Sequence, residues 1–293
     1  MTWDELFERF TASGRLAPNT IFGYSKHLKA FLHFWSDQGL SGPANVEPRH
    51  LQGFYLHQRR QTGEDWASRQ LRTVLTLLRW AVKHGFLLAD PGQEIQLAKP
   101  PQPIMRILTR EEAALLLDAP NQARGQIRLR DKAMLELQYG TGMRGGEVVA
   151  LNLTDVDLAE QTVTILGGKG RPRQVPFGQR PTAALKDYLE MVLPDREGSG
   201  ETALFLTMSG DRMTVSNLGS QLRRYGETLG IPDVTCHAFR RACATHLLEN
   251  GANIAEIKTL LGHDDINSTL IYAQVLPHEL LRSHKTYHPR ATK

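Results

Sequence analysis

Hydrophobic residues recur at helical spacing in two long segments near the start of the chain. Between about Thr20 and Trp35 six apolar side chains fall on one face, which predicts an amphipathic helix. A second helix is predicted from about Trp66 to His84, with Gly85 as its end. Another face of this second helix carries a row of basic residues: Arg69, Arg72, Arg79 and Lys83. Such a row can bind phosphates, but it is equally typical of a plain solvated surface.

A proline-rich stretch divides the chain. The sequence LAKPPQP, from Leu97 to Pro103, contains three prolines that cannot continue a helix and that suit a stiff, extended connector. We therefore predict a helical domain over residues 1–97, a linker over 98–106 and a second domain over 107–293. Thr109 and Glu112 form a capping-box pattern, so the second domain is expected to open with a helix.

The second domain contains two short segments of strand character. Residues 162–165 (TVTI) and 174–177 (QVPF) flank the glycine-rich stretch 167–172, a pattern that predicts a β-hairpin. The remainder is predicted to be mostly helical, with helix ends at Gly251 and Gly262. The expected fold class is mainly α with a small antiparallel β-sheet in the second domain (α+β).

Composition narrows the class of protein only slightly. The 293 residues are 41% hydrophobic and 23% charged, which excludes disordered and collagen-like chains. A net charge of +4 is compatible with a polyanionic partner. The start, MTWDELFERF, lacks a signal-peptide pattern, and no apolar run is long enough for a membrane span, so a cytoplasmic protein is expected. The two cysteines, Cys236 and Cys243, are expected to be reduced, mostly buried thiols.

Four sequence fragments carry the candidate chemistry. They are TGMRGGEVVAL (141–151), GGKGRPRQVPF (167–177), HAFRRACATHLL (237–248) and LLGHDDINSTLIYAQV (260–275). Any one of them alone is weak, but in this order and spacing, with His263 nine residues before Tyr272, they resemble the tyrosine recombinase family. In the first domain, the pattern of Asn19, Thr20, Tyr24, Leu28, Phe31 and Phe34 resembles the helical core-binding domain of the same family.

The resemblance implies a role for each of the residues that match the family. Transfer of a DNA phosphodiester needs a nucleophile, neutralisation of the charge on the phosphate, and a proton for the leaving oxygen. Tyr272 matches the nucleophile that forms a 3′-phosphotyrosine, and Arg144 and Arg240 match the arginines that hold the phosphate oxygens. Lys169 matches the lysine that protonates the leaving 5′-oxygen.

Two histidines and a glutamate complete the implied site. His237 matches the family position for proton transfer and phosphate contact, and His263 matches a hydrogen-bond donor to the phosphate. Glu147, one helix turn from Arg144, is expected to hold that arginine in position. No cofactor and no catalytic metal are expected. A zinc site would have to use His237, His246, His263 and Cys236, which lack the paired short spacings of such sites.

Each residue also has a plainer interpretation. Taken alone, Arg144 could be a surface arginine and Tyr272 a core aromatic, while Lys169 could serve solubility at a hairpin tip. The neighbouring Arg171 and Arg173 are candidate DNA contacts. His246, which lies beside two leucines, is expected to be a core histidine.

The chain departs from the family pattern at two points. Gly145 and Gly146 follow the first arginine, and at about 1 kcal/mol per glycine they are expected to weaken the helix and loosen Arg144. Arg241 stands where many family members carry histidine, so changed packing is expected there.

This resemblance implies a site-specific recombinase that integrates, excises or resolves a mobile element or a replicon. Its expected partners are double-stranded DNA with inverted half-sites and further copies of itself, as a dimer on one site and a tetramer in the synapse. The compact length favours a two-domain member without an added arm-binding domain. Two alternatives stay open: a type IB topoisomerase-like enzyme that nicks and reseals one duplex, and a DNA-binding protein without catalysis. The target sequence and the biological event are not readable from the chain.

Overall fold

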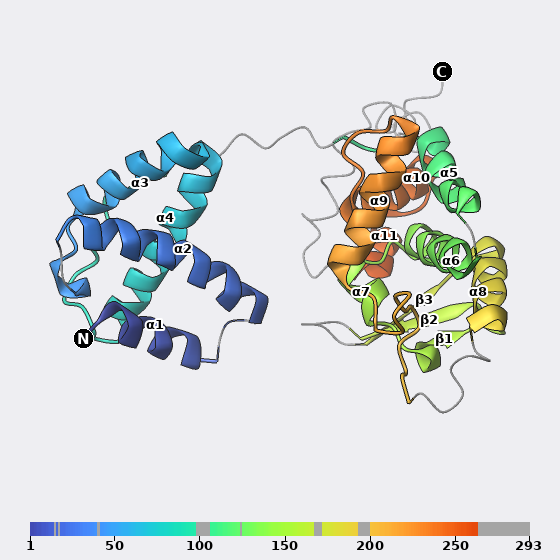
Figure 1. The fold of residues 1–293 in the computed structure, drawn as a ribbon, viewed down its shortest axis with the longest axis horizontal. Coiled ribbons are helices and arrows are strands. Elements are labelled where there is room, and N and C mark those ends of the chain that lie inside the picture. The colour runs from blue at the N-terminus through green and yellow to red at the C-terminus, as the bar shows by residue number, and fades with distance from the viewer. Residues whose placement is uncertain are drawn as a thin grey trace, which may run out of the picture. The chain divides into compact units, whose positions relative to one another are not determined.

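The computed structural model describes residues 1–14, 16, 18–39, 42–97, 106–123, 125–166, 172–192 and 200–262. The chain divides into two compact units, Met1–Pro103 and Ile104–Lys293. Helices dominate both, and the one sheet of the described ranges lies in the second unit (Figure 1). This confirms the predicted fold class. Each unit is considered by itself below.

The first unit is built from four helices around a core rich in aromatic side chains. Its elements are α1 (Trp3–Ala12), α2 (Pro18–Asp37), the 3-10 turn η1 (Pro43–Asn45), α3 (Pro48–Thr62) and α4 (Glu64–Lys83). The two helices predicted from hydrophobic spacing correspond to α2 and α4. Phe31 of α2 lies at the centre, where its ring meets the edges of Trp3 and Phe54, with both pairs of ring centroids 5.1 Å apart. The four helices are therefore joined by apolar packing.

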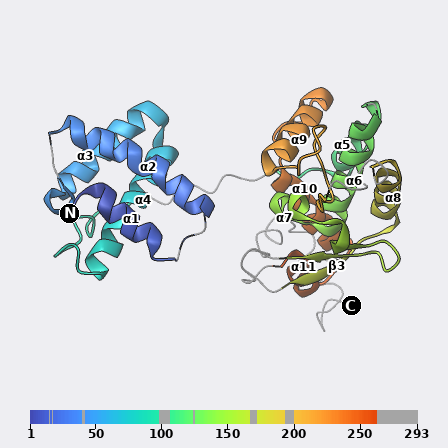
Figure 2. The ribbon, with the colours of Figure 1, turned by 60° about the horizontal axis from the view of Figure 1, so that its bottom comes forward.

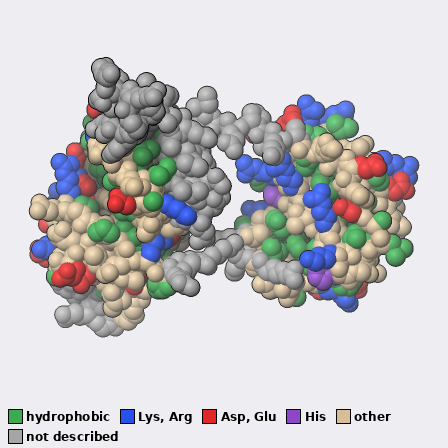
Figure 3. Space-filling view, turned by 180° about the vertical axis from the view of Figure 1, so that it is seen from behind, with side chains coloured by type: hydrophobic (Ala, Val, Ile, Leu, Met, Phe, Trp, Pro, Cys, Tyr) green, Lys and Arg blue, Asp and Glu red, His purple; other side chains and the backbone are tan. Residues whose placement is uncertain are grey.

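The surface side of α4 carries the predicted basic row. Arg69, Arg72, Arg79 and Lys83 are all exposed, while Leu71, Val74, Leu75 and Leu78 on the other side are buried. Arg79 also forms a 3.4 Å ion pair with Asp90. Figure 3 shows Lys and Arg side chains distributed over one face of this unit. The structure thus presents the row to solvent, where a polyanion can reach it.

The second unit packs helices against a three-stranded sheet. Its elements are α5 (Arg110–Asp118), η2 (Ala119–Gln122), α6 (Gly125–Thr141), α7 (Gly145–Ala150), η3 (Leu153–Asp155), β1 (Val156–Asp157), β2 (Thr162–Ile165), β3 (Arg173–Pro176), α8 (Gln179–Val192), α9 (Val215–Leu229), α10 (Cys236–Glu249) and α11 (Ile254–Leu261). The predicted Thr109–Glu112 capping box is present at the start of α5. Gly251 and Gly262, at the predicted helix ends, both have positive φ angles.

The sheet is antiparallel, in the order β1-β2-β3. Val163 of β2 pairs with Val175 of β3, and both side chains are buried together with Ile165. The hydrophobic alternation therefore turns one face of the hairpin into the core. The strand β1 was not predicted, because two residues are too few to produce an alternating pattern.

Helix α6 is the centre of the second unit and contacts α8 and α10 (Figures 1 and 2). A buried polar cluster fixes its position. Arg130 and Asp131 form an ion pair at 2.7 Å, and Asp131 also accepts a 2.6 Å hydrogen bond from Tyr225 of α9. The Arg130 guanidinium donates in addition to the carbonyl of Leu206. Because each buried charge has a partner, the cluster joins α6 to two neighbouring segments without leaving an unpaired ion. No described helix combines the length and apolar character needed to cross a membrane.

Candidate active site

Arg144 is held at the start of α7 by Glu147. Helix α6 ends at Thr141, and Gly142 turns the chain with a φ of +65°. Arg144 is the N-cap of the next helix, so its backbone N–H has no partner within the helix. Glu147 accepts from that N–H at 2.8 Å and from Nη1 of the Arg144 side chain at 3.0 Å. The Arg144 side chain remains 43% exposed, which leaves it accessible to a ligand.

Gly145 permits α7 to approach the start of α10 closely. A Cβ atom at Gly145 would lie 2.9 Å from both Cβ and Sγ of Cys236, closer than real contacts allow. Gly146 is exposed, and a Cβ there would meet only Val215, at 3.8 Å. The expectation that both glycines loosen Arg144 needs correction at Gly145, because that glycine brings Arg144 towards the catalytic candidates of α10.

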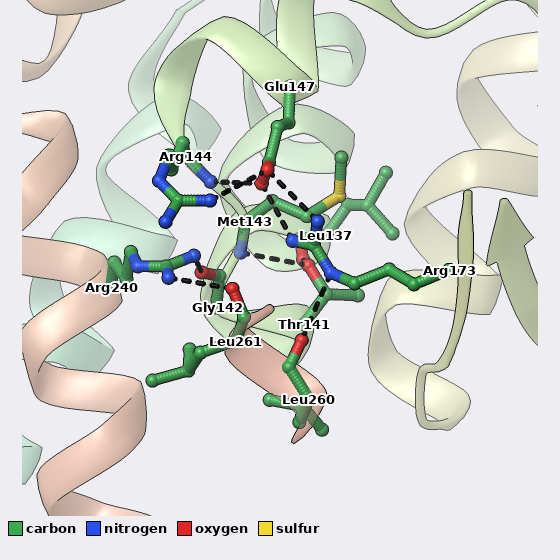
Figure 4. Close-up of polar contacts among 10 residues, drawn as sticks. All are labelled: Leu137, Thr141, Gly142, Met143, Arg144, Glu147, Arg173, Arg240, Leu260 and Leu261. Atoms are coloured by element: carbon green, nitrogen blue, oxygen red, sulfur yellow. Dashed lines mark hydrogen bonds and ion pairs between the residues drawn. The ribbon is translucent and has the colours of Figure 1, made fainter. Parts of the chain in front are cut away.

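Arg240 lies beneath this junction, on α10. It is only 3% exposed. Its Nη1 donates to the carbonyl of Gly142 at 2.8 Å and its Nη2 donates to the carbonyl of Leu261 at 2.7 Å. Figure 4 shows the guanidinium group of Arg240 beside the turn that leads into Arg144. Arg240 therefore joins the end of α6 to the end of α11 and fixes a permanent positive charge at the site.

His237 lies one turn before Arg240 and shares the same electrostatic environment. Desolvation of its ring lowers its pKa, and the positive charges of Arg240, Arg241 and Arg144 lower it further. The backbone contacts agree with this: Arg240 binds the carbonyl of Gly142, two residues before Arg144, and Cys236, the residue before His237, packs against Gly145. A histidine with a lowered pKa is neutral near pH 7 and can accept a proton.

Arg173, which the sequence predicted as a DNA contact, faces Glu147 in the structure. From the start of β3 its Nη1 and Nη2 donate to Oε1 and Oε2 of Glu147, at 3.0 and 2.9 Å, and the side chain is only 17% exposed (Figure 4). Its Nε donates to the carbonyl of Leu260 at 3.3 Å. Burial raises the pKa of Glu147, but the hydrogen bonds and charges of Arg173 and Arg144 outweigh this effect and hold that pKa below its ordinary value. The observed contacts favour a supporting role for Arg173.

The other end of α7 is capped by Arg212. Its Nη1 donates to the carbonyls of Ala150 and Leu151 at 3.0 Å each and of Val149 at 3.3 Å, and its Nη2 donates to Oδ1 of Asn152 at 2.7 Å. A cation at the C-terminal carbonyls stabilises a helix. Sequence reasoning missed this residue, because nothing in the local pattern links Arg212 to a helix some sixty positions earlier in the chain.

The remaining histidine and the two thiols of this region are structural. His246 is buried, as predicted; its ring nitrogens bind Tyr139 Oη at 2.8 Å and the Leu108 carbonyl at 3.0 Å. The Leu108 carbonyl can only accept, so Nε2 donates to it, and in the neutral ring Nδ1 accepts from Tyr139 Oη. Burial raises the pKa of the Cys243 thiol to about 12, and it raises the pKa of Cys236 as well. Both cysteines are free thiols, and neither is a reactive nucleophile.

The structure leaves several predicted site residues without a position. Lys169, Arg171, His263 and Tyr272 lie outside the described residues. The chain segments that lead to them are described: β2 and β3 flank residues 167–171, and α11 with Gly262 precedes His263. Of the six predicted catalytic residues, the structure places Arg144, His237 and Arg240, which lie on elements that contact each other at the start of α7 and in α10. Within the described ranges, no group of three His, Cys, Asp or Glu side chains could hold a metal ion.

Comparison with protein families and curated proteins gives matches along most of the chain. Residues 106–279 match the model of the phage integrase family, and residues 4–85 match the phage integrase N-terminal SAM-like domain. Tyrosine recombinase XerC of Roseiflexus castenholzii is 33% identical over 294 residues, covering 99% of this chain and 94% of that protein. Tyrosine recombinase XerD of Ralstonia nicotianae is 32% identical over 281 residues, covering 94% and 90%.

Solved structures share the fold. XerA recombinase is 25% identical with a TM-score of 0.56, and the match covers 98% of each chain. The Tn1549 transposon integrase in complex with a circular intermediate DNA has a TM-score of 0.74 at 18% identity, covering 96% of this chain and 99% of that one. XerH bound to its difH substrate has a TM-score of 0.71 at 20% identity, covering 91% and 79%.

Proposed function

The chain belongs to the phage integrase family of tyrosine recombinases, and we propose that it cleaves and rejoins DNA at specific sites through a covalent bond between Tyr272 and a 3′-phosphate. One observation supports this most strongly. Arg144 is far in sequence from His237 and Arg240, yet the start of α7 packs against the start of α10, and Arg240 binds the turn that leads into Arg144. Two permanent cations and a neutral imidazole suit the binding of a phosphodiester and the removal of a proton next to it.

In the proposed cleavage step, one P–O bond forms as another breaks. The Tyr272 oxygen attacks the scissile phosphorus, forming a P–O bond to tyrosine and breaking the bond to the 5′-oxygen of the next nucleotide. The phenolic proton passes to His237, because burial and the neighbouring arginines lower its pKa and keep the ring neutral, with a nitrogen free to accept. Lys169 gives a proton to the departing 5′-oxygen. Rejoining reverses the step with a 5′-hydroxyl from either duplex, so no external energy source is needed.

The arginines stabilise the charge that develops on the phosphate during this step. Arg144 is accessible and is oriented by Glu147, which suits direct contact with the non-bridging oxygens. Arg240 is buried, and a charge in such surroundings acts more strongly than it would in water. His263 is proposed to donate a further hydrogen bond to the phosphate.

We propose that residues 1–97 form a core-binding domain and residues 107–293 the catalytic domain, with 98–106 as the linker. The exposed basic row of α4 suits contact with DNA phosphates. Exchange of strands between two duplexes requires four active tyrosines, so a dimer on inverted half-sites and a tetramer in the synapse are proposed. The cytoplasm, where the DNA lies, is the proposed location.

The proposed biological reaction is the resolution of chromosome or plasmid multimers. About one-third identity to XerC and XerD over nearly the whole chain supports the Xer-like group. The transposon integrase, at 18% identity, shares the fold alone and gives no support to a mobile element. A plasmid dimer carrying the target site tests this: purified protein is expected to convert it to monomers, whereas relaxation without resolution would favour a topoisomerase-like enzyme.

Covalent capture of DNA tests the proposed cleavage chemistry and identifies the target site in the same experiment. Fragmented genomic DNA from the source organism, nicked at low density to trap intermediates, is incubated with the protein, and SDS-resistant complexes are isolated and sequenced. Wild type is expected to retain one recurring sequence, and Tyr272→Phe is expected to retain none. If the protein binds DNA tightly but wild type gives no SDS-resistant complex, the protein is a DNA-binding protein without catalysis.

A further inference from the structure

Three arginines lie close together in the described part of the candidate active site, and one of them, Arg173, is not exposed enough to contact phosphate. Arg144, Arg240 and Arg173 converge on one small region of the second unit (Figure 4). Arg173 is directed away from solvent, with 17% of its side chain exposed against 43% for Arg144. Its guanidinium is therefore poorly placed to contact a DNA backbone.

The contacts of Arg173 saturate the Glu147 carboxylate. Each of the two oxygens accepts two hydrogen bonds, one from Arg144 and one from Arg173, at distances from 2.8 to 3.0 Å. An ionised carboxylate has about four acceptor positions. Glu147 is thus fixed in one orientation, and the Arg144 side chain that binds it is fixed as well.

The same arrangement leaves a net positive charge around Glu147. A carboxylate paired with Arg144 alone would cancel the charge that the phosphate needs. Two arginines around one carboxylate leave a net charge of +1. Arg144 is the more exposed of the two, so an approaching phosphate meets this net charge at Arg144.

Arg173 also fixes the end of α11. Its Nε donates to the carbonyl of Leu260, and Arg240 donates to the next carbonyl, that of Leu261. Gly262 follows with a φ of +63°, and a Cβ there would lie 2.9 Å from Cζ of Arg173. The guanidinium group therefore occupies the space beside the last described residue before the segment that contains His263 and Tyr272.

We propose that Arg173 is a positioning residue for DNA strand cleavage, which orients Glu147 while leaving Arg144 its positive charge, and which anchors the end of α11. The proposal rests on the proposed function. It predicts two separable contributions, one from the forked geometry of the guanidinium and one from its charge. Arg173→Lys removes the fork and keeps the charge, whereas Arg173→Gln removes both.

The test measures single-turnover cleavage of the captured site as a pre-nicked duplex, at protein concentrations that saturate binding. Arg173→Lys is expected to cleave about tenfold more slowly, since small misplacements of catalytic groups are costly. Arg173→Gln is expected to cleave about 100-fold more slowly, since positive charge at the transition state is also lost. DNA affinity and its dependence on salt concentration are expected to match wild type in both variants.

A second substrate separates the effect of losing the Arg173 charge from the effect of general damage to the fold. It carries a methylphosphonate, which has no negative charge, in place of the scissile phosphate. Because the charge of Arg144 matters less there, the difference between Arg173→Lys and Arg173→Gln is expected to disappear, while the shared loss from the missing fork remains. Arg130→Lys is the matched control: it disturbs another buried arginine–carboxylate pair, and is expected to lower the unfolding midpoint without slowing cleavage of folded protein.

Each other outcome overturns a distinct claim. Wild-type cleavage rates in both variants, or an unchanged gap between them on the neutral substrate, would contradict the positioning role. Weaker binding with a salt slope reduced by about one phosphate contact would make Arg173 a DNA-binding residue instead. If wild type itself forms no covalent product on any fragment, the proposed function fails and this inference fails with it.

Discussion

Replacement of Gly145 by alanine tests whether the close approach of α7 to α10 positions Arg144, a proposed catalytic residue. The new Cβ would lie 2.9 Å from two atoms of Cys236, and ordinary contact begins at 3.4 Å. The two helix starts must therefore separate by about 0.5 Å. Overpacking of this kind costs about 1–3 kcal/mol. Up to about 1 kcal/mol is recovered because alanine favours the helix, so a net loss of about 1 kcal/mol is expected.

The effect on catalysis is expected to be larger than the effect on stability. A misplacement of about 1 Å costs about 100-fold in rate, so a shift of half that size is expected to slow cleavage about tenfold. Urea unfolding measures the first quantity, and single-turnover cleavage of a pre-nicked site measures the second. Gly146→Ala is the matched control, because its Cβ has room. It is expected to be neutral or slightly stabilising and to cleave at the wild-type rate. Equal cleavage by the two variants would refute the reasoning.

Three further predictions concern the supports of the site and its DNA contacts. Arg212→Ala leaves the last carbonyls of α7 without a cation and is expected to cost about 2 kcal/mol in urea unfolding; an unchanged midpoint would mean that water replaces the guanidinium. Burial lowers the pKa of His246, so below about pH 6.5 the unfolded chain binds more protons than the folded protein does. The free energy of unfolding is therefore expected to decrease as the pH is lowered through this range. His246→Gln, which cannot titrate, is expected to flatten this part of the profile, measured as urea midpoints from pH 5 to 8. Arg69→Ala and Lys83→Ala are each expected to weaken DNA binding and to reduce its salt slope by about one, with cleavage at saturation unaffected.

The fold was largely predictable because its signals are local. Apolar spacing predicted α2 and α4, and the Thr109–Glu112 pattern predicted the start of α5. Residues 162–165 and 174–177 predicted the hairpin, to within one residue at β3. Each of these signals lies within a few residues of the element that it predicts. The strand β1 is too short to leave such a signal.

The catalytic candidates were identified from the order of their fragments, and so was the contact of Glu147 with Arg144, but the other supporting contacts were not. Arg173 was grouped with Arg171 as a DNA contact, because a sequence shows a charge without showing which carboxylate it faces. Gly145 was judged by helix propensity, which takes no account of the Cys236 side chain packed against it. The contacts of Arg212 and Arg240 are made by groups far apart in sequence. The roles of all four residues depend on tertiary contacts, and such contacts leave no periodic pattern in the sequence.

Identification of the residue that carries the DNA tests the central claim most directly. The SDS-resistant complex of wild-type protein with the captured site is digested with nuclease and protease, and the modified peptide is sequenced by mass spectrometry. The account predicts a nucleotide joined through its 3′-phosphate to the side chain of Tyr272. A nucleotide attached to any other residue, or one joined through a 5′-phosphate, would contradict it.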